Sequence, residues 1–333
     1  MEEVYHLTPA ALGLTNIEAS ARLAMCSQLR IPEKFFLAFL AYLTTAALFF
    51  PLDIKQRLTL IAINSLAAMV FFLLGRHGVP GRSRFLTVVR DWLPCFLILV
   101  AYRESGLFFT QDPTHRLDHV LIRWDDMVLK NPWIVQTLTW GAPWIQRYLE
   151  FAYFLCYPIV PLGLASLYLV RQNPAASSGN EAGAHRPYVH AMEHFWTAVL
   201  LASFTCYLLF PLFPLTPPRE LFNDVPGPRV APLLRGMNHW LLGHYAVGAS
   251  LFPSAHVAAT TAMALVIRRY LPRFGWIFVV IAASIALATV YGRYHYAADA
   301  VAGALVGIAA FLIAERIQNA KGNESHPEST RAR

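Results

Sequence analysis

The chain has 333 residues, of which 56% are hydrophobic and only 14% charged, and its formal net charge is +7. A typical soluble domain carries roughly 25% charged residues, so this composition argues against soluble domains and indicates a polytopic membrane protein. Most basic residues fall between apolar runs, where they set membrane orientation and meet anionic lipid, so nucleic-acid binding is not expected.

Eight apolar stretches approach the length of about 20 residues that a helix needs to cross a bilayer. We expect them at 34–51, 58–75, 91–109, 147–170, 192–213, 256–271, 274–292 and 296–315. Between the third and the fourth, the spacing of apolar residues and tryptophans from Leu117 to Gln146 predicts an interfacial amphipathic helix. The expected fold is therefore an all-α, polytopic bundle of about eight transmembrane helices.

Eight crossings would place both termini on the same side of the membrane. That side holds 16 of the 27 Lys and Arg residues, so the positive-inside rule predicts that both termini are cytoplasmic. Three polar clusters would then emerge together on the opposite, non-cytoplasmic face, and we expect them to form one site. The clusters are Pro217 to Arg219, Pro253 to His256, and Arg293 to Asp299.

The third cluster contains a histidine and an aspartate four residues apart, His295 and Asp299. On a helix this spacing puts both side chains on one face, so the carboxylate can fix the ring tautomer and leave the other nitrogen as a base or nucleophile. A second histidine, His256, can then donate a proton to a leaving group. His239 and His244, which precede the second cluster, are expected to be ordinary loop residues.

The remaining polar residues of these clusters suit a phosphate. Arg219 and Arg293 can bind phosphate oxygens with two parallel hydrogen bonds, and Ser254 adds a hydroxyl donor. A helix that starts near His256 would also direct its first backbone N–H groups at an anion. The sequence therefore predicts a phosphoryl-transfer site, and without a set of three or four metal ligands beside it we expect a metal-independent mechanism.

Two of these motifs match a family. Pro253-Ser254-Ala255-His256 resembles the PSxH signature of the type 2 phosphatidic acid phosphatase (PAP2) superfamily, and the stretch from His295 to Asp299 resembles its HxxxD signature. The resemblance implies a six-helix-type core and a phosphohistidine on His295, with Asp299 as its orienter and His256 as the acid. It also implies that Ser254 holds phosphate and that no cofactor is needed.

The chain departs from the phosphatase branch of that superfamily at two places. Thr289 stands where the branch has an arginine, six residues before the nucleophile, and Arg293 is offered instead. Pro217-Pro218-Arg219 replaces the first motif of the branch, and together with Tyr294-His295-Tyr296 it resembles the subgroup of the inositol phosphorylceramide synthases. The resemblance therefore leaves two reactions open, lipid phosphate hydrolysis and transfer of an inositol-phosphate-type head group.

The expected organisation has three parts. Residues 1–146 form an N-terminal membrane region, 147–315 the PAP2-like catalytic membrane domain, and 316–333 a polar, disordered cytoplasmic tail. The expected partners are a lipid phosphate or phospholipid substrate and the membrane itself, which in a bacterium would be the inner membrane. A proton-coupled transporter or lipid flippase is the alternative, but it would distribute ionisable groups across the bilayer instead of clustering them at one face.

Overall fold

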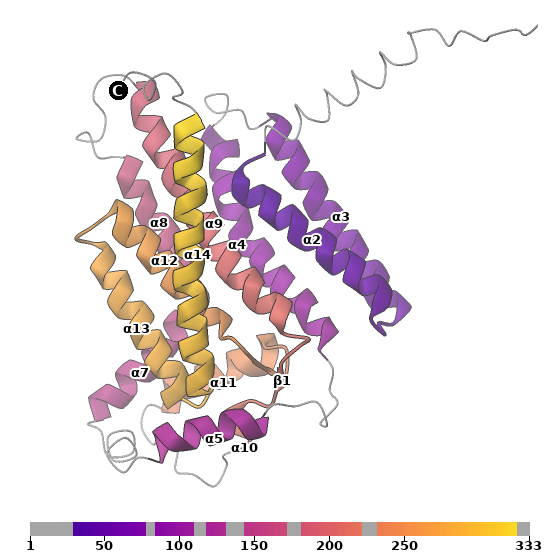
Figure 1. The fold of residues 1–333 in the computed structure, drawn as a ribbon, viewed down its shortest axis with the longest axis vertical. Helices are drawn as coiled ribbons and strands as arrows, with labels where there is room; N and C mark the ends of the chain where they lie inside the picture. Colours follow the sequence, from indigo (N-terminus) through magenta and orange to yellow (C-terminus); the bar gives the residue numbers. More distant parts are fainter. Residues whose placement is uncertain are drawn as a thin grey trace, which may run out of the picture.

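The computed structural model describes residues 29–77, 84–109, 118–130, 143–171, 181–221 and 232–324. Within these ranges almost all secondary structure is helical, which confirms the predicted all-α fold (Figure 1). The helices are α2 (Ile31–Phe49), α3 (Ile54–His77), α4 (Arg84–Ser105), η1 (Gly106–Phe108), α5 (Asp118–Leu129), α7 (Pro143–Leu155), α8 (Ile159–Arg171), α9 (Glu181–Leu209), α10 (Pro218–Leu221), α11 (Pro232–Tyr245), α12 (Ala255–Tyr270), α13 (Gly275–Tyr291) and α14 (Ala297–Glu324). Two very short strands, β1 (Pro214–Leu215) and β2 (Ser250–Leu251), pair antiparallel.

Each predicted apolar stretch coincides with helix, but the fourth is not continuous. The expected segment 147–170 consists of α7 and α8, which meet at a bend of 71°. The chain turns at Cys156–Pro158, because a proline lacks the backbone N–H of a helix and disfavours helical geometry in the residue before it. The predicted segment is therefore two helices, which can still make up one bent span.

The last helix is longer than the sequence predicted. It continues past residue 315, so residues 316–324 of the expected tail are helical, while residues 325–333 lie outside the described ranges. The predicted amphipathic helix before α7 is present as α5, and the rest of that stretch up to residue 142 is likewise not described.

Several of the described helices have the length and composition of membrane spans. Five qualify, namely α2, α3, α4, α9 and α14, or six if the bent pair α7 and α8 is one span. By contrast, α12 has only 16 residues, which rise about 24 Å against a hydrocarbon core of about 30 Å. Eight crossings thus remain a prediction, whereas insertion into a membrane is supported by the apolar helices themselves.

The centre of the bundle is α12, which packs against α8, α9, α13 and α14. Two glycines one turn apart let α14 approach it closely. A Cβ atom at Gly303 would lie 2.5 Å from the carbonyl oxygen of Ser254, and one at Gly307 would lie 2.5 Å from that of Ala258. Small residues at this spacing allow close helix contact in membranes, and here the contact fixes the height of α14 against α12.

The N-terminal helices α2, α3 and α4 lie on the other side of α9 from α13 (Figure 1). Ion pairs tie the start of α2 to α4: Arg90 Nη2 lies 2.6 Å from Glu33 Oε2, and Arg30 pairs with Asp91. Asp91 also accepts a hydrogen bond of 2.7 Å from the Tyr188 hydroxyl on α9. These contacts join the N-terminal helices to the central bundle.

Candidate active site

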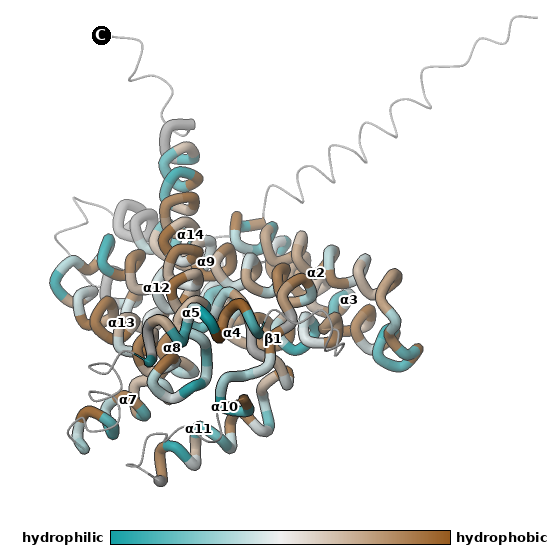
Figure 2. The backbone as a smooth tube through the Cα atoms, turned by 60° about the horizontal axis from the view of Figure 1, so that its bottom comes forward, coloured by the Kyte–Doolittle hydropathy of each residue, from teal (hydrophilic) through white to brown (hydrophobic). Residues whose placement is uncertain are grey.

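The residues of the three polar clusters come together at one end of the bundle. The beginning of α12, the end of α13 and the beginning of α14 meet there, together with the chain that follows α9 (Figure 1). Turned so that this end comes forward, the molecule shows α5, α10 and α11 arranged around it (Figure 2). Segments far apart in sequence therefore converge where the sequence predicted a site.

His295 and Asp299 are in contact, although not in the way a continuous helix would arrange them. His295 precedes α14, and Asp299 lies in the first turn of that helix and reaches back. Its Oδ2 lies 3.3 Å from Nδ1 of His295 and accepts the Tyr296 N–H at 3.1 Å. Asp299 is fully buried and His295 nearly so. The geometry leaves Nε2 as the ring nitrogen of His295 that does not face the carboxylate.

His256 is the second residue of α12, and its ring centroid lies 6.1 Å from that of His295. Ser254 is the N-cap of this helix, and its Oγ accepts the Val257 N–H at 3.5 Å. The Ser254 N–H in turn donates to the backbone carbonyl of Asp299 at 3.1 Å. This last bond couples the two signature motifs directly, and a hydroxyl that accepts one bond can still donate another.

The turn between α13 and His295 is closed by a single carbonyl. Thr289 O accepts both the Tyr294 N–H at 2.9 Å and the His295 N–H at 3.1 Å, and Thr289 itself is fully buried. Within the turn, Arg293 has a φ of 60°, a left-handed conformation that is uncommon for residues other than glycine and costs about 1–3 kcal/mol. Such strain is typical of functional sites and requires that the surroundings hold the turn firmly.

A buried glutamate that the sequence analysis did not single out supports this turn. Glu150 on α7 is 1% exposed, and its Oε2 accepts the Tyr294 hydroxyl at 2.8 Å and the Asn238 amide at 3.0 Å. Its Oε1 accepts Nη1 of Arg235 at 2.7 Å. The ring of Tyr153, also on α7, stacks on Tyr294 with centroids 3.6 Å apart. Only the proximity of α7, α11 and the turn reveals this network, since its members are far apart in sequence.

Three arginines lie around the site. Arg219 is on α10, where Nη2 lies 3.5 Å from Oε1 of its neighbour Glu220, and Arg293 is half-buried in the turn. Burial, and then the charge of Arg235, lower the pKa of Arg293. A bound anion would stabilise the charged guanidinium of Arg293, which this environment disfavours. Arg219, Arg293 and Arg235 thus make this end of the bundle suitable for phosphate oxygens.

The prediction that His239 and His244 are loop residues is wrong, because both lie on the helix α11. The sequence from 232 to 245 is amphipathic but holds two glycines, which weaken a helix, and tertiary contacts with α7 outweigh that preference. His239 lies 6.2 Å from Tyr294 between ring centroids. Burial lowers the pKa of His239, and the charges of Arg235 and Arg219 lower it further. By contrast, His244 is exposed and bonds a carbonyl of its own helix.

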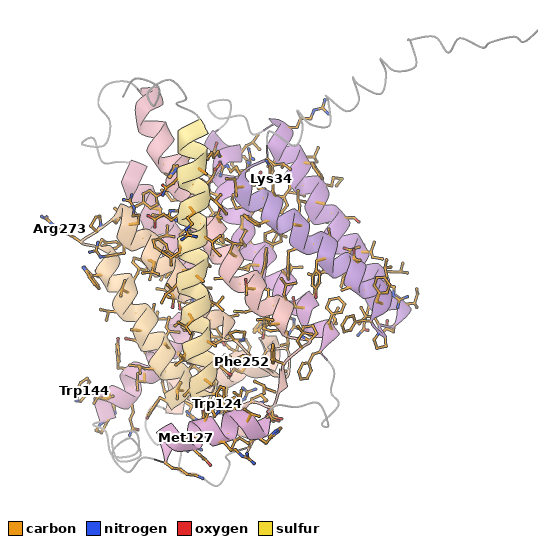
Figure 3. The ribbon with its side chains drawn as sticks, viewed as in Figure 1. Lys34, Trp124, Met127, Trp144, Phe252 and Arg273 are labelled. Atoms are coloured by element: carbon orange, nitrogen blue, oxygen red, sulfur yellow. The ribbon has the colours of Figure 1, made fainter. Side chains whose placement is uncertain are left out.

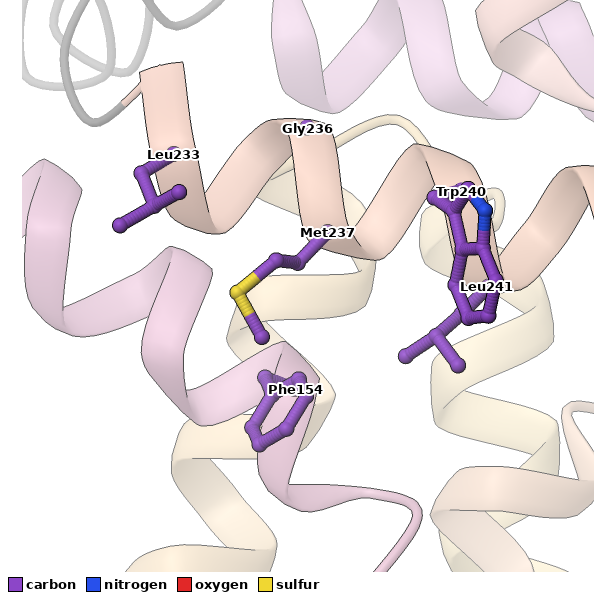
Figure 4. Close-up of a pocket in the computed structure, with 6 residues that line it drawn as sticks. All are labelled: Phe154, Leu233, Gly236, Met237, Trp240 and Leu241. Atoms are coloured by element: carbon purple, nitrogen blue, oxygen red, sulfur yellow. The ribbon is translucent and has the colours of Figure 1, made fainter.

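An apolar cavity of about 530 Å³ lies between α7 and α11 (Figure 4). The side chains that line it come from both helices: Phe154, Leu233, Gly236, Met237, Trp240 and Leu241. Phe154 directly follows Tyr153, and Met237 directly precedes Asn238, so the polar site and the apolar cavity share the same two helices. Among the described residues, no three His, Cys, Asp or Glu side chains are placed to hold a metal ion.

Comparison with known families agrees with the two signature motifs. Residues 182–313, which are less than half of the chain, match the family model described as the PAP2 superfamily. No curated protein and no solved structure gives a significant match. The matched range contains both histidines and Asp299 but neither α5 nor Glu150. Residues 182–313 of the chain are thus similar to the PAP2 superfamily.

Proposed function

We propose that this protein transfers a phosphoryl group, or a phospho-head group, from a lipid phosphate through a phosphohistidine on His295. The match of residues 182–313 to the PAP2 superfamily supports phosphatase or phosphotransferase chemistry in general. The observation that carries the finer proposal is the pairing of His295 with Asp299 beside a second histidine, His256, at 6.1 Å between ring centroids.

In the first step, Nε2 of His295 attacks phosphorus, and the bond from phosphorus to the leaving oxygen breaks. His256, in its protonated form, gives its proton to that oxygen. Asp299 holds Nδ1 of His295 and stabilises the positive charge that develops on the ring. In the second step, the oxygen of water or of an alcohol attacks phosphorus while His256 takes its proton. The phosphorus–nitrogen bond then breaks and both histidines return to their starting forms.

The phosphate itself would be held by Ser254, Arg293 and Arg219. Support comes from the position of Ser254 at the start of α12, whose first backbone N–H groups point out of the helix end. The half-buried, left-handed position of Arg293 keeps its charge close to the histidine turn. Because the two histidines supply nucleophile and acid, these steps proceed without a metal ion or a cofactor.

The substrate is a lipid because an apolar cavity lies between the same two helices, α7 and α11, that support the histidine turn. The cavity between α7 and α11 has almost no polar lining and would take a hydrocarbon chain while the phosphate reaches the histidines. We infer from the distribution of basic residues that both termini are cytoplasmic and that the site is on the non-cytoplasmic face. In a bacterial cell the protein would lie in the inner membrane.

The second reactant decides the reaction class. Water would make the protein a lipid phosphate phosphatase, and an alcohol would make it a head-group transferase. The motifs around Arg219 and His295 resemble the inositol phosphorylceramide synthases, which favours an inositol-phosphate-type transfer. In such a transfer the inositol phosphate comes from the donor lipid, so we expect a new inositol-phosphate lipid when a second lipid alcohol accompanies a phosphoinositol lipid.

The test is to incubate detergent-purified protein with phosphorus-labelled phospholipids, with and without alcohol acceptors, and to separate free phosphate from new lipid or phosphoalcohol. Acid-labile, base-stable label on the protein should map to His295. His295→Ala and His256→Ala should each lower turnover by at least ~10³-fold, as expected for members of a catalytic unit. His244→Ala, an exposed histidine bonded within its own helix, is the matched control and should retain full turnover.

Two results would overturn the proposal. Full turnover by His295→Ala would remove the nucleophile assignment. Absence of both products on every lipid phosphate tried, with lipid transport by the same protein in vesicles, would favour the transporter alternative.

A further inference from the structure

The helix α5 lies outside the residues that match the PAP2 family model, yet its carboxylates reach the site. We propose that α5 is a positioning element of the active site, in which Asp125 holds the start of α14 and Asp118 holds the loop before Arg219. The inference rests on the proposed function, since it assigns α5 a role in placing His295 and the phosphate-binding arginine.

Asp125 caps the helix that carries Asp299. Its Oδ1 accepts the N–H of Ala297, the first residue of α14, at 2.9 Å. The first N–H groups of a helix have no partner within the helix, and a carboxylate there also meets the positive end of the helix dipole. Because Asp125 accepts the hydrogen bond from the Ala297 N–H, Oδ2 of Asp299 can accept the Tyr296 N–H and contact Nδ1 of His295. Two carboxylates thus share the first turn of α14.

Asp118 binds the chain that leads to Arg219. Its two oxygens accept hydrogen bonds from the Thr216 N–H at 2.7 Å and from the Thr216 hydroxyl at 2.8 Å. The Thr216 carbonyl in turn accepts the Tyr296 hydroxyl at 3.1 Å. The loop with Arg219 and the residue next to His295 are therefore joined to each other and to α5.

The two faces of α5 differ in a way that fits this role. Asp118, Leu121 and Asp125 follow a spacing of three and four residues and point inward, where Leu121 packs with Leu215 and Tyr296. Asp125 is 3% exposed, whereas Trp124 and Met127, labelled in Figure 3, are 53% and 77% exposed. An ordinary amphipathic helix buries apolar residues alone, because a buried carboxylate is costly unless its hydrogen bonds are satisfied. On α5 the inward-facing carboxylates, of which Asp125 is buried, make the contacts to the site.

The experiment compares Asp125→Ala with Asp125→Asn, whose amide oxygen can still accept the Ala297 N–H. Asp126→Ala is the matched control, since Asp126 is adjacent on α5 and pairs with Lys130 in the next turn of the same helix. We expect Asp125→Ala to lower kcat about 10-fold to 100-fold at unchanged KM, because small displacements of reacting groups have effects of that size. Asp125→Asn should recover most of kcat, and Asp126→Ala should match the parent protein.

Replacing Asp118 should have the opposite effect on the two kinetic constants, changing KM more than kcat. Asp118→Ala releases the loop that leads to Arg219, so KM for the lipid phosphate should rise about tenfold with a smaller change in kcat. Hydrogen–deuterium exchange of the peptide spanning residues 295–300 provides a measurement that does not depend on turnover. Exchange there should rise in Asp125→Ala and stay at the parent level in Asp125→Asn and Asp126→Ala.

The outcomes separate the two proposals. Unchanged exchange in Asp125→Ala, or an equal fall of kcat in Asp125→Ala and Asp125→Asn, would overturn the positioning role. A loss confined to the yield of folded protein, with kcat per phosphorylatable site unchanged, would also overturn it. Absence of turnover in the parent protein would instead overturn the proposed function, and the exchange measurement would still decide whether Asp125 holds α14.

Discussion

Replacing Gly303 by alanine should separate the two signature motifs while leaving every side chain of the site intact. A Cβ atom at this position would lie 2.5 Å from the carbonyl oxygen of Ser254. Contacts of a Cβ below 3.0 Å are essentially never seen, so α14 and the residue before α12 must move apart by at least about 0.5 Å. The obstacle is backbone rather than the end of a flexible side chain, and it cannot turn aside.

The expected loss of activity follows from this displacement. A misplacement of about 1 Å between reacting groups costs about 10²-fold, so half that distance should cost about tenfold in kcat. The Ser254 N–H also donates to the Asp299 carbonyl, and this bond should lengthen as the helices separate. Overpacking of this kind also lowers the free energy of unfolding by about 1–3 kcal/mol.

Gly307→Ala is the control that separates packing from catalysis. Its Cβ would meet the carbonyl oxygen of Ala258 at the same 2.5 Å, but one helical turn farther from the histidines. It should therefore lower stability about as much as Gly303→Ala while lowering kcat less. Gly243→Ala, on α11, adds a Cβ with no atom within 4 Å, so it should leave kcat unchanged and should not lower stability, because alanine favours a helix more than glycine does.

The assay is turnover of a labelled lipid phosphate by each purified variant in detergent, divided by the fraction of protein that takes up label on the site histidine. Thermal unfolding in the same detergent reports stability. Equal losses of kcat in Gly303→Ala and Gly307→Ala, or full activity of Gly303→Ala, would refute the argument that the contact between α12 and α14 sets the distance between the histidines.

Three further predictions concern other parts of the site. Glu150→Gln keeps an oxygen for its hydrogen bonds but leaves the Arg235 charge unpaired. Thermal unfolding should show that the free energy of unfolding falls by about 2 kcal/mol. This is less than the roughly 3–5 kcal/mol of a fully buried pair, because the Arg235 side chain is 23% exposed. Burial, the largest cause, raises the pKa of Asp125 from 3.8 to about 6, so the ionised side chain costs stability. The stability of the parent relative to Asp125→Asn should therefore fall as pH rises from about 4 to 6 and level off above that, and a difference in melting temperature that does not vary with pH would contradict it. Gly236→Leu would add a side chain at the lining of the apolar cavity, at a position where a Cβ has no atom within 4 Å. It should raise KM for a long-chain lipid phosphate several-fold and leave a short-chain analogue unaffected, whereas Gly243→Leu, equally open but outside the cavity lining, should affect neither.

The sequence predicted the helices well where a long apolar stretch had only one way to fold. Every predicted stretch became helix, because backbone groups in an apolar environment must bond within the segment. It did not predict where α7 and α8 separate, because Pro158 permits either a kink or a break and only the packing of α8 against α9 and α12 decides between them. It also missed α11, since the local preference of its glycines opposed the contacts that stabilise it.

Within the site, the chain by itself determined the pairing of His295 with Asp299, because residues four positions apart are brought close by local backbone geometry whether or not the helix has begun. The first signature motif likewise made His256 a candidate, and its ring centroid lies 6.1 Å from that of His295. Tertiary structure alone decided which groups support these residues: Glu150 reaches Tyr294 across 144 positions of sequence, and Asp125 reaches Ala297 across 172. Such contacts depend on how helices pack, and an isolated carboxylate in a sequence carries no sign of the distant N–H or hydroxyl that it will meet.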